Sequence, residues 1–362
     1  MLTQEDVELW KKYNDTDEKI PEESLDKLVR NQCKKTPELP AVIYKDTVLS
    51  YGELYEKAGK IAGYLHSKGL KAGEYVSVSG EKKLETVINI IGILFAGCAY
   101  VPENPDYPQE RNKYMAENSG CKARLDINSY ELENIDSYEP YECESDSNRE
   151  AYTIYTSGST GVPKGVVIRH SAASNTIQDI NRKYNVGTDD RIIGLSSFSF
   201  DLNVYDVFGA LSTGAALVLI EDQRNPDEIE KILKEQKITF WNSVPAIMGM
   251  YLMSGGSGCE SLKHVLLSGD WIPLHLPNQI REKFPNADVT SLGGATEGSI
   301  WSIHYPINKI PEGMSSIPYG MPLANQKMYL IDDYGKLCAI GARGEICIGG
   351  VGVAEGYANQ PE

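Results

Sequence analysis

The sequence predicts an α/β fold, because strand-like apolar runs alternate with helical patterns through most of its 362 residues. Such alternation is typical of largely buried strands covered by helices. A hydrophobic fraction of 41% is that of a folded globular protein with a sizeable core. The strand-like runs span residues 75–78, 191–195, 216–220, 238–242, 264–268 and 288–292.

Helical patterns lie in several segments. Ser50 and Glu53 form a capping-box pattern at the start of an amphipathic helix that ends near Gly69. Its apolar stripe consists of Leu54, Ala58, Ile61 and Leu65. The longest uncharged run, Thr86 to Val101, is shorter than the roughly 20 residues that a bilayer requires, so it predicts a buried helix leading into a strand. Residues 226–236 carry a further helical pattern.

Changes in composition divide the chain into three predicted lobes. Residues 119–150 are rich in Asp, Glu, Ser and Asn, which indicates a surface excursion and a join. After about Trp301 the pattern changes to short strands with Gly and Pro turns, which favours a small β lobe. The predicted division is a first α/β lobe at about 20–150, a second at 151–304 and the β lobe at 305–362.

Charge and cysteine content exclude several classes of partner. The formal net charge of −16 opposes binding to nucleic acid, since no cluster of Lys and Arg compensates it. Seven cysteines without CxxC spacing indicate reduced thiols. The acidic N-terminal stretch lacks the layout of a secretory signal. We therefore expect a cytoplasmic protein that binds neither nucleic acid nor membrane.

The run YTIYTSGSTGVPKGV, residues 152–166, joins a strand to a loop of small hydroxyl residues and glycines that closes on Lys164. Backbone N–H groups, hydroxyls and one fixed cation can converge on phosphate oxygens, which predicts a phosphate-binding loop. It is not a Walker P-loop, because Gly165 follows the lysine where that motif needs Ser or Thr. The alternative is a flexible surface turn; the Pro-Lys-Gly closure favours phosphate binding.

The same run resembles the most diagnostic motif of adenylate-forming enzymes, and in detail that of the adenylation domains of nonribosomal peptide synthetases. Five further segments look like other motifs of this family, in the family's order, from about Ser50 to the last residue. They are LSYGEL, LFAGCAYVPENPDYP, SFDLNVYDVFGAL, GGATEGSIW and GEICIGGVGVAEGYANQPE. The resemblance implies a large N-terminal subdomain of two helix-covered sheets with a small distorted β-barrel lobe.

The resemblance also implies a reaction. An amino-acid carboxylate attacks the α-phosphorus of ATP, usually with Mg²⁺, and the aminoacyl group then passes to the phosphopantetheine thiol of a carrier domain. It assigns catalysis to Thr296, Glu297 and Lys164, with Glu297 as the Mg²⁺ ligand. It assigns ATP binding to Thr156, Ser157, Gly158, Ser159, Thr160, Gly161, Lys164, Gly293 and Thr296.

One motif departs from the family. Most members carry Tyr-Gly-Pro before Thr-Glu, with the tyrosine stacked on adenine, whereas this chain has Gly293, Gly294 and Ala295. Only the backbone position of Gly293 is therefore carried over.

Two roles compete for Asp201. The apolar spacing after it predicts a helix for which Asp201 is the N-cap. The resemblance instead pairs Asp201 with the α-ammonium group of an amino-acid substrate, and a buried carboxylate gains a charge-assisted hydrogen bond there. Both roles can hold at once.

Alignment of the motifs places the rest of a substrate pocket mostly at the carboxyl ends of predicted strands, where open α/β sheets bind ligands. The pocket residues are Asp201, Leu202, Tyr205, Asn242, Leu266, Ser268, Leu292, Ile300 and Trp301. The set predicts a small, largely apolar cavity that favours a thiol, and it resembles that of cysteine-activating domains in thiazoline-forming siderophore synthetases. L-Cysteine is the expected substrate, with serine, threonine and alanine as alternatives.

Two other functions compete with amino-acid activation: an acyl- or aryl-CoA ligase of the same superfamily, and a non-catalytic scaffold. Asp201 argues against the ligase, and retention of Lys164, Thr296 and Glu297 against the scaffold. The family's small C-terminal lid is absent from this chain, so we expect weak activity without it. A heterocyclisation domain is an expected neighbour.

Overall fold

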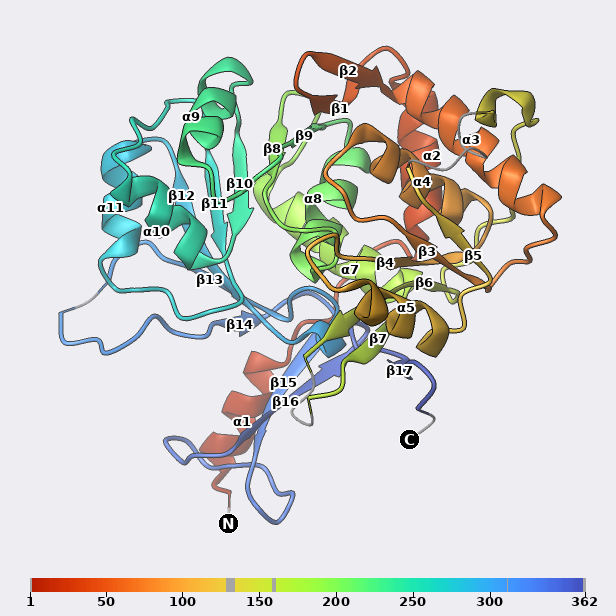
Figure 1. The fold of residues 1–362 in the computed structure, drawn as a ribbon. Helices are drawn as coiled ribbons and strands as arrows, with labels where there is room; N and C mark the ends of the chain where they lie inside the picture. Colours follow the sequence, from red (N-terminus) through yellow and green to blue (C-terminus); the bar gives the residue numbers. More distant parts are fainter. Residues whose placement is uncertain (1, 128–133, 158–160, 311, 361–362) are drawn as a thin grey trace.

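A computed structural model describes residues 2–127, 134–157, 161–310 and 312–360. Two mixed β-sheets with helices packed on their faces form the body, which confirms the predicted α/β class (Figure 1). All seven cysteines are free. Within the described part of the chain, no helix has the length and apolar character needed to cross a membrane.

The larger sheet has nine strands in the order β14-β13-β12-β11-β10-β8-β9-β1-β2. Strands β1, β9, β8, β10, β11 and β12 run parallel to their neighbours, while β2, β13 and β14 add antiparallel edges. The carboxyl ends of the parallel strands thus meet at one edge. The strands are β1 Pro40–Tyr44, β2 Thr47–Ser50, β8 Arg191–Gly194, β9 Ala216–Leu219, β10 Phe240–Ser243, β11 His264–Leu267, β12 Asp288–Gly293, β13 Ile303–Pro306 and β14 Met321–Pro322.

The second sheet has six strands in the order β17-β7-β6-β4-β3-β5. Its strands β5, β3, β4 and β6 are parallel, and β7 and β17 are antiparallel additions. They are β3 Tyr75–Val78, β4 Ala99–Pro102, β5 Ala123–Leu125, β6 Glu150–Thr156, β7 Lys164–Arg169 and β17 Gly356–Tyr357. Sheet membership does not follow chain order, since β1 and β2 join the larger sheet while β6 and β7 join the smaller one.

The C-terminal part contributes to all three sheets. Strands β15 (Gln326–Ile331) and β16 (Glu345–Gly350) form a separate antiparallel pair, while β14 and β17 extend the two large sheets. Helix α1 (Gln4–Tyr13) lies beside the pair, away from the main body (Figure 1). In the described residues, the predicted small β lobe is this two-stranded sheet with its loops.

The helices pack on both faces of the larger sheet. Helix α8 contacts β8, β9 and β10 on the face toward the second sheet, and α7 packs between α8 and β7. Helices α9, α10 and α11 cover the outer face (Figure 1), where a separate apolar cluster forms. The helices are α2 Leu25–Lys35, α3 Tyr51–Ser67, α4 Leu84–Phe95, α5 Gln109–Asn118, α7 His170–Tyr184, α8 Asp201–Leu211, α9 Pro226–Glu235, α10 Pro245–Met253 and α11 Leu276–Lys283, with short 3₁₀ turns η1 Ile135–Ser137 and η2 Thr296–Gly298.

Local sequence signals fix these elements well. The Ser50 hydroxyl accepts a hydrogen bond from the Glu53 N–H, and the Glu53 carboxylate accepts one from the Ser50 N–H, so the predicted capping box is confirmed. The uncharged run forms α4 followed by β4, as predicted. Strand β10 begins at Phe240, two residues later than predicted.

Helices α3 and α4 pack closely because of a glycine at their contact. A Cβ atom at Gly92 would lie 2.5 Å from the Ile61 Cβ and 2.9 Å from the Ala58 carbonyl oxygen. Neither atom is the far end of a flexible side chain. Gly92 therefore sets the distance between these two helices.

We predict that Gly92→Ala lowers the free energy of unfolding. Overpacking costs about 1–3 kcal/mol, which outweighs the gain in helix propensity of up to about 1 kcal/mol. Gly249→Ala in α10 is the matched control, because a Cβ atom there meets no atom within 4 Å and should leave stability unchanged or slightly raised. Urea denaturation measures both; equal stability of the two variants would contradict the packing explanation.

Candidate active site

A hydrogen bond joins two of the predicted site segments. The Thr296 hydroxyl, on η2 after β12, donates to Oδ2 of Asp201 on α8 at 2.8 Å. This bond holds together two residues that are 95 positions apart in the sequence, at the carboxyl edge of the larger sheet. Burial raises the pKa of Asp201, and the hydrogen bond from Thr296 opposes that rise. The carboxylate thus lies in a site where an added cation would be stabilised.

The prediction that Asp201 is the N-cap of its helix is wrong, because the N-cap lies one residue earlier. Helix α8 begins at Asp201, and its N-cap is Phe200, whose side chain makes no capping hydrogen bond. The carboxylate bonds to Thr296 across the site, and the backbone N–H groups of Leu202 and of Asp201 itself also lower its pKa. Its position in the first helical turn still places negative charge at the favourable end of the helix dipole.

Tyr357 connects the other two predicted catalytic residues. Its hydroxyl donates to Oε1 of Glu297 at 2.7 Å, and the Lys164 ammonium lies 5.1 Å from the centre of its ring. The backbone N–H of Ala354 also bonds to the Glu297 carbonyl at 2.8 Å. Segments around residues 164, 297 and 357 therefore converge. The pKa of Tyr357 is raised, first by its hydrogen bond to Glu297.

The predicted phosphate-binding loop connects β6 to β7 in a hairpin. Thr156, the last residue of β6, pairs with Lys164, the first residue of β7, so the lysine stands at the base of the loop. Ser157 is exposed, and Gly161 has a φ of +80°, a conformation that favours glycine. Three of the predicted loop residues, Gly158, Ser159 and Thr160, lie outside the described residues.

The apolar members of the predicted pocket lie in one contiguous core cluster between the two sheets. The rings of Tyr205 and Trp301 are 5.0 Å apart, and Tyr205 turns its hydroxyl away to donate to Asn181 at 3.0 Å. The predicted pocket residues in this cluster are Leu202, Tyr205, Leu266, Leu292, Ile300 and Trp301. These residues come from α8, β11, β12 and the segment after η2, so the fold brings together positions that the sequence separates.

The two polar pocket residues are both buried and partly engaged. The Trp301 indole N–H donates to the Ser268 hydroxyl at 3.0 Å. The Asn242 amide donates to Asp206 Oδ1 at 2.8 Å and to the Leu202 carbonyl at 3.1 Å. Oδ1 of Asn242 has no hydrogen-bond partner among the described residues, so an acceptor remains buried beside the cluster.

Behind Asn242 lie two charged residues that the sequence reasoning missed, Lys82 and Asp206. The Lys82 ammonium donates to the carbonyls of Gly194, at 2.8 Å, and of Ser196, and it lies in the field of Asp206. Burial raises the pKa of Asp206 to about 7 and lowers that of Lys82 to about 8. Asp206 falls within the quoted motif SFDLNVYDVFGAL, but no local pattern links it to a lysine on a distant loop.

The two residues that directly precede Trp301 have left-handed backbone conformations. Ser299 has a φ of +60° and Ile300 one of +69°. For a β-branched residue such a conformation is a genuine outlier that costs about 1–3 kcal/mol. Both side chains are buried, and the turn directs Ile300 and Trp301 into the cluster. Strain of this kind gathers at functional sites.

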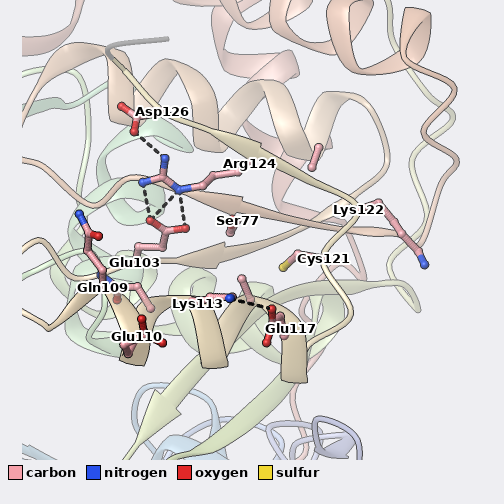
Figure 2. Close-up of a pocket in the computed structure, with 13 residues that line it drawn as sticks. Ser77, Glu103, Gln109, Glu110, Lys113, Glu117, Cys121, Lys122, Arg124 and Asp126 are labelled. Carbon is pink, nitrogen blue, oxygen red and sulfur yellow. Dashed lines mark hydrogen bonds and ion pairs between the residues drawn. The ribbon is translucent and has the colours of Figure 1, made fainter.

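A separate hollow lies away from the predicted site residues. It measures about 670 Å³ and lies against α5, β3 and β5. Figure 2 shows several of its charged groups paired with each other: Arg124 with Glu103 and Asp126, and Lys113 with Glu117. None of the predicted site residues lines it. Most of its charged side chains are thus already paired.

Residues 29–358 match the family model described as AMP-binding enzyme. The chain is 48% identical over 354 residues to bacitracin synthase 1 of Bacillus licheniformis, an alignment that covers 97% of this chain and 7% of that protein. It is 39% identical over 351 residues to pyochelin synthetase PchF of Pseudomonas aeruginosa, covering 90% of this chain and 19% of that protein. The chain thus spans a small part of the length of these relatives.

Solved structures of the nonribosomal peptide synthetase FmoA3 have the same fold. The AMPPNP-bound form superposes with a TM-score of 0.92 at 32% sequence identity, covering 100% of this chain and 41% of that one. The form bound to α-methyl-L-serine-AMP also gives a TM-score of 0.92 at 32% identity, covering 99% and 43%.

We predict that Ser268 and Trp301 are energetically coupled. Ser268→Ala leaves the buried indole N–H without its acceptor and should lower the free energy of unfolding by about 1–3 kcal/mol. Trp301→Phe removes the donor, so the double variant should lose less than the sum of the two single losses, with a coupling of about 1 kcal/mol. Denaturant titration of the four proteins measures the cycle; strict additivity would contradict a hydrogen bond between them.

Proposed function

The chain belongs to the AMP-binding enzyme family, in its nonribosomal peptide synthetase adenylation type, and we propose that it activates an amino acid as aminoacyl-AMP. An oxygen of the substrate carboxylate attacks the α-phosphorus of ATP, an O–P bond forms, the bond to the bridging oxygen breaks and pyrophosphate leaves. The aminoacyl group is then transferred to the phosphopantetheine thiol of a carrier domain.

The observation that carries this proposal is the continuous line of contacts between functional groups. Asp201 bonds to Thr296, the adjacent Glu297 bonds to Tyr357, and Tyr357 lies under Lys164. Asp201 is the carboxylate that would pair with the ammonium group, and Lys164 is the cation that would bind phosphate. The Thr296 hydroxyl and the Glu297 carboxylate thus lie between them. Phosphoryl transfer of this kind depends on positioning and on stabilising charge, which such an arrangement supplies.

Glu297 fits the role of Mg²⁺ ligand. Mg²⁺ is usually held by one or two carboxylates together with phosphates and water, so it needs no protein cage. Among the described residues no group of three or more His, Cys, Asp or Glu side chains could hold a metal ion, which agrees with a single carboxylate. When bound, Mg²⁺ would neutralise charge on the phosphates. Thr296 would bind the α-phosphate and Lys164 the β- and γ-phosphates.

Asp201 favours an amino acid over an aryl or fatty acid. Its carboxylate is in a desolvated position with a raised pKa, and a substrate ammonium group would restore the charge balance. An acid that lacks the ammonium group would leave this carboxylate unpaired, which is costly. The competing acyl- or aryl-CoA ligase has no use for such a group.

The buried cluster favours a short side chain, and we propose L-cysteine. The predicted pocket residues include two aromatic and four aliphatic side chains in one buried cluster, with the Asn242 oxygen and the Ser268 hydroxyl as polar groups. A thiol is a weak hydrogen-bond donor. The Asn242 oxygen can accept a hydrogen bond from it while the sulfur lies against apolar atoms. Serine, threonine and alanine are the alternatives, because apolar pockets discriminate such groups by only about 1–3 kcal/mol.

The partners and the domain division follow from the same proposal. Similarity to segments of much longer peptide synthetases supports a carrier domain that accepts the aminoacyl group. A heterocyclisation domain as a neighbour, the lobes at about 20–150, 151–304 and 305–362, and a separate lid that raises the rate remain parts of the proposal.

Amino-acid-dependent ATP–pyrophosphate exchange tests the function. We predict exchange above background with L-cysteine, weaker exchange with serine, threonine and alanine, and none with benzoate or a fatty acid. Exchange with benzoate but no amino acid would favour the ligase alternative. Absence of exchange, together with absence of ATP binding, would favour the scaffold.

We predict that Asp201→Asn raises the KM for the amino acid by about 10- to 100-fold, because it removes a charge-assisted hydrogen bond. The asparagine keeps the volume and can still accept from Thr296, so the KM for ATP should change by less than about threefold. Asp227→Asn, an exposed change in the first turn of α9, is the control. Equal rises in both KM values would show that Asp201 has no specific role toward the amino acid.

A further inference from the structure

A tyrosine ring occupies the space beside Gly293, at the end of β12. A Cβ atom at Gly293 would lie 2.8 Å from Cε2 of Tyr319 and 2.9 Å from Cδ1 of Ile303. Both distances are shorter than real Cβ contacts allow, so the ring edge comes this close only because residue 293 has no side chain. The glycine and the tyrosine are thus complementary in shape.

The backbone holds Tyr319 in this place. The next residue, Gly320, has a φ of +118°, and a Cβ atom there would lie 2.6 Å from the His304 carbonyl oxygen. Directly after it, Met321 pairs with His304 as β14 joins β13. A bend that needs glycine, followed at once by strand pairing, fixes where the Tyr319 ring leaves the chain.

The ring is anchored at its edge and open to solvent. Tyr319 is 46% exposed, an unusual exposure for a large side chain packed on a sheet end. Burial raises the pKa of its hydroxyl, and a hydrogen bond with the Gly294 backbone opposes that rise. One part of the tyrosine is therefore held by the protein while a substantial part of its surface remains available.

The position of the ring relates it to the nucleotide. Gly293 precedes Thr296 by three residues, and Thr296 bonds to Asp201, so Tyr319 borders the segment that the proposed function assigns to ATP. A flat, exposed aromatic surface beside a phosphate-binding segment suits a purine base, because bases stack on aromatic rings with little demand on their hydrogen-bonding edges.

We propose that Tyr319 supplies the surface on which the adenine of ATP stacks, in place of a side chain at position 293. The inference rests on the proposed function, since it assigns a residue to the nucleotide of that reaction. Tyr319 is then a binding residue for the base, distinct from the groups that hold the phosphates.

Calorimetric titration of the chain with ATP and, separately, with inorganic tripolyphosphate tests the assignment. Tyr319→Ala and Tyr319→Leu should each weaken ATP binding by about tenfold or more, since base stacking on an aromatic ring has effects of this size. Tyr319→Phe keeps the ring and should bind ATP within about threefold of the unaltered chain. Tripolyphosphate has no base, so its affinity should be the same for all four proteins.

Tyr334→Ala is the matched control, because Tyr334 is 87% exposed in the turn between β15 and β16; its ATP affinity should not change. Unaltered ATP affinity in Tyr319→Leu would overturn the assignment, and so would an equal loss of tripolyphosphate binding, which indicates a general structural effect. If the unaltered chain binds neither compound, the proposed function fails, and this result differs from a failure of the Tyr319 assignment alone.

Discussion

The hydrogen bond between Thr296 and Asp201 is the contact on which the site depends, because it joins the end of β12 to the start of α8. It also holds two acidic residues, Asp201 and Glu297, near each other in a partly buried place, and the charge of Glu297 adds to the rise in the pKa of Asp201. Two carboxylates so placed need cations. The substrate ammonium group and Mg²⁺ are the cations that the proposed reaction supplies.

Rigid packing keeps this charged edge in place. The cluster around Trp301 and Tyr205 fills the space between the sheets, and each of the two rings is fixed by a hydrogen bond from its polar end, to Ser268 and Asn181 respectively. Below it, Asp206 accepts a hydrogen bond from Asn242, and Lys82 donates to the carbonyls of Gly194 and Ser196. Hydrogen bonds to charged groups are costly to break, which suits a floor that must keep its shape.

The sequence correctly predicts the elements that local signals determine. The capping box at Ser50 and most strand bounds follow from spacing alone, and motif order located the residues that the fold then brought together. Sequence reasoning missed contacts between distant segments, such as Lys82 with the Gly194 carbonyl and Tyr357 with Glu297, because no local pattern encodes them. It also placed the N-cap one residue late, since the actual N-cap, Phe200, has no capping side chain that could mark it in the sequence.

The most direct test compares two non-hydrolysable adenylate mimics, one of cysteine and one of 3-mercaptopropionate, which differ only in the ammonium group. Calorimetry on the unaltered chain should show binding of the cysteinyl mimic and a loss of about 10- to 100-fold without the ammonium group. The account predicts that this difference largely disappears in Asp201→Asn. A difference of the same size in that variant would contradict the pairing of Asp201 with the substrate.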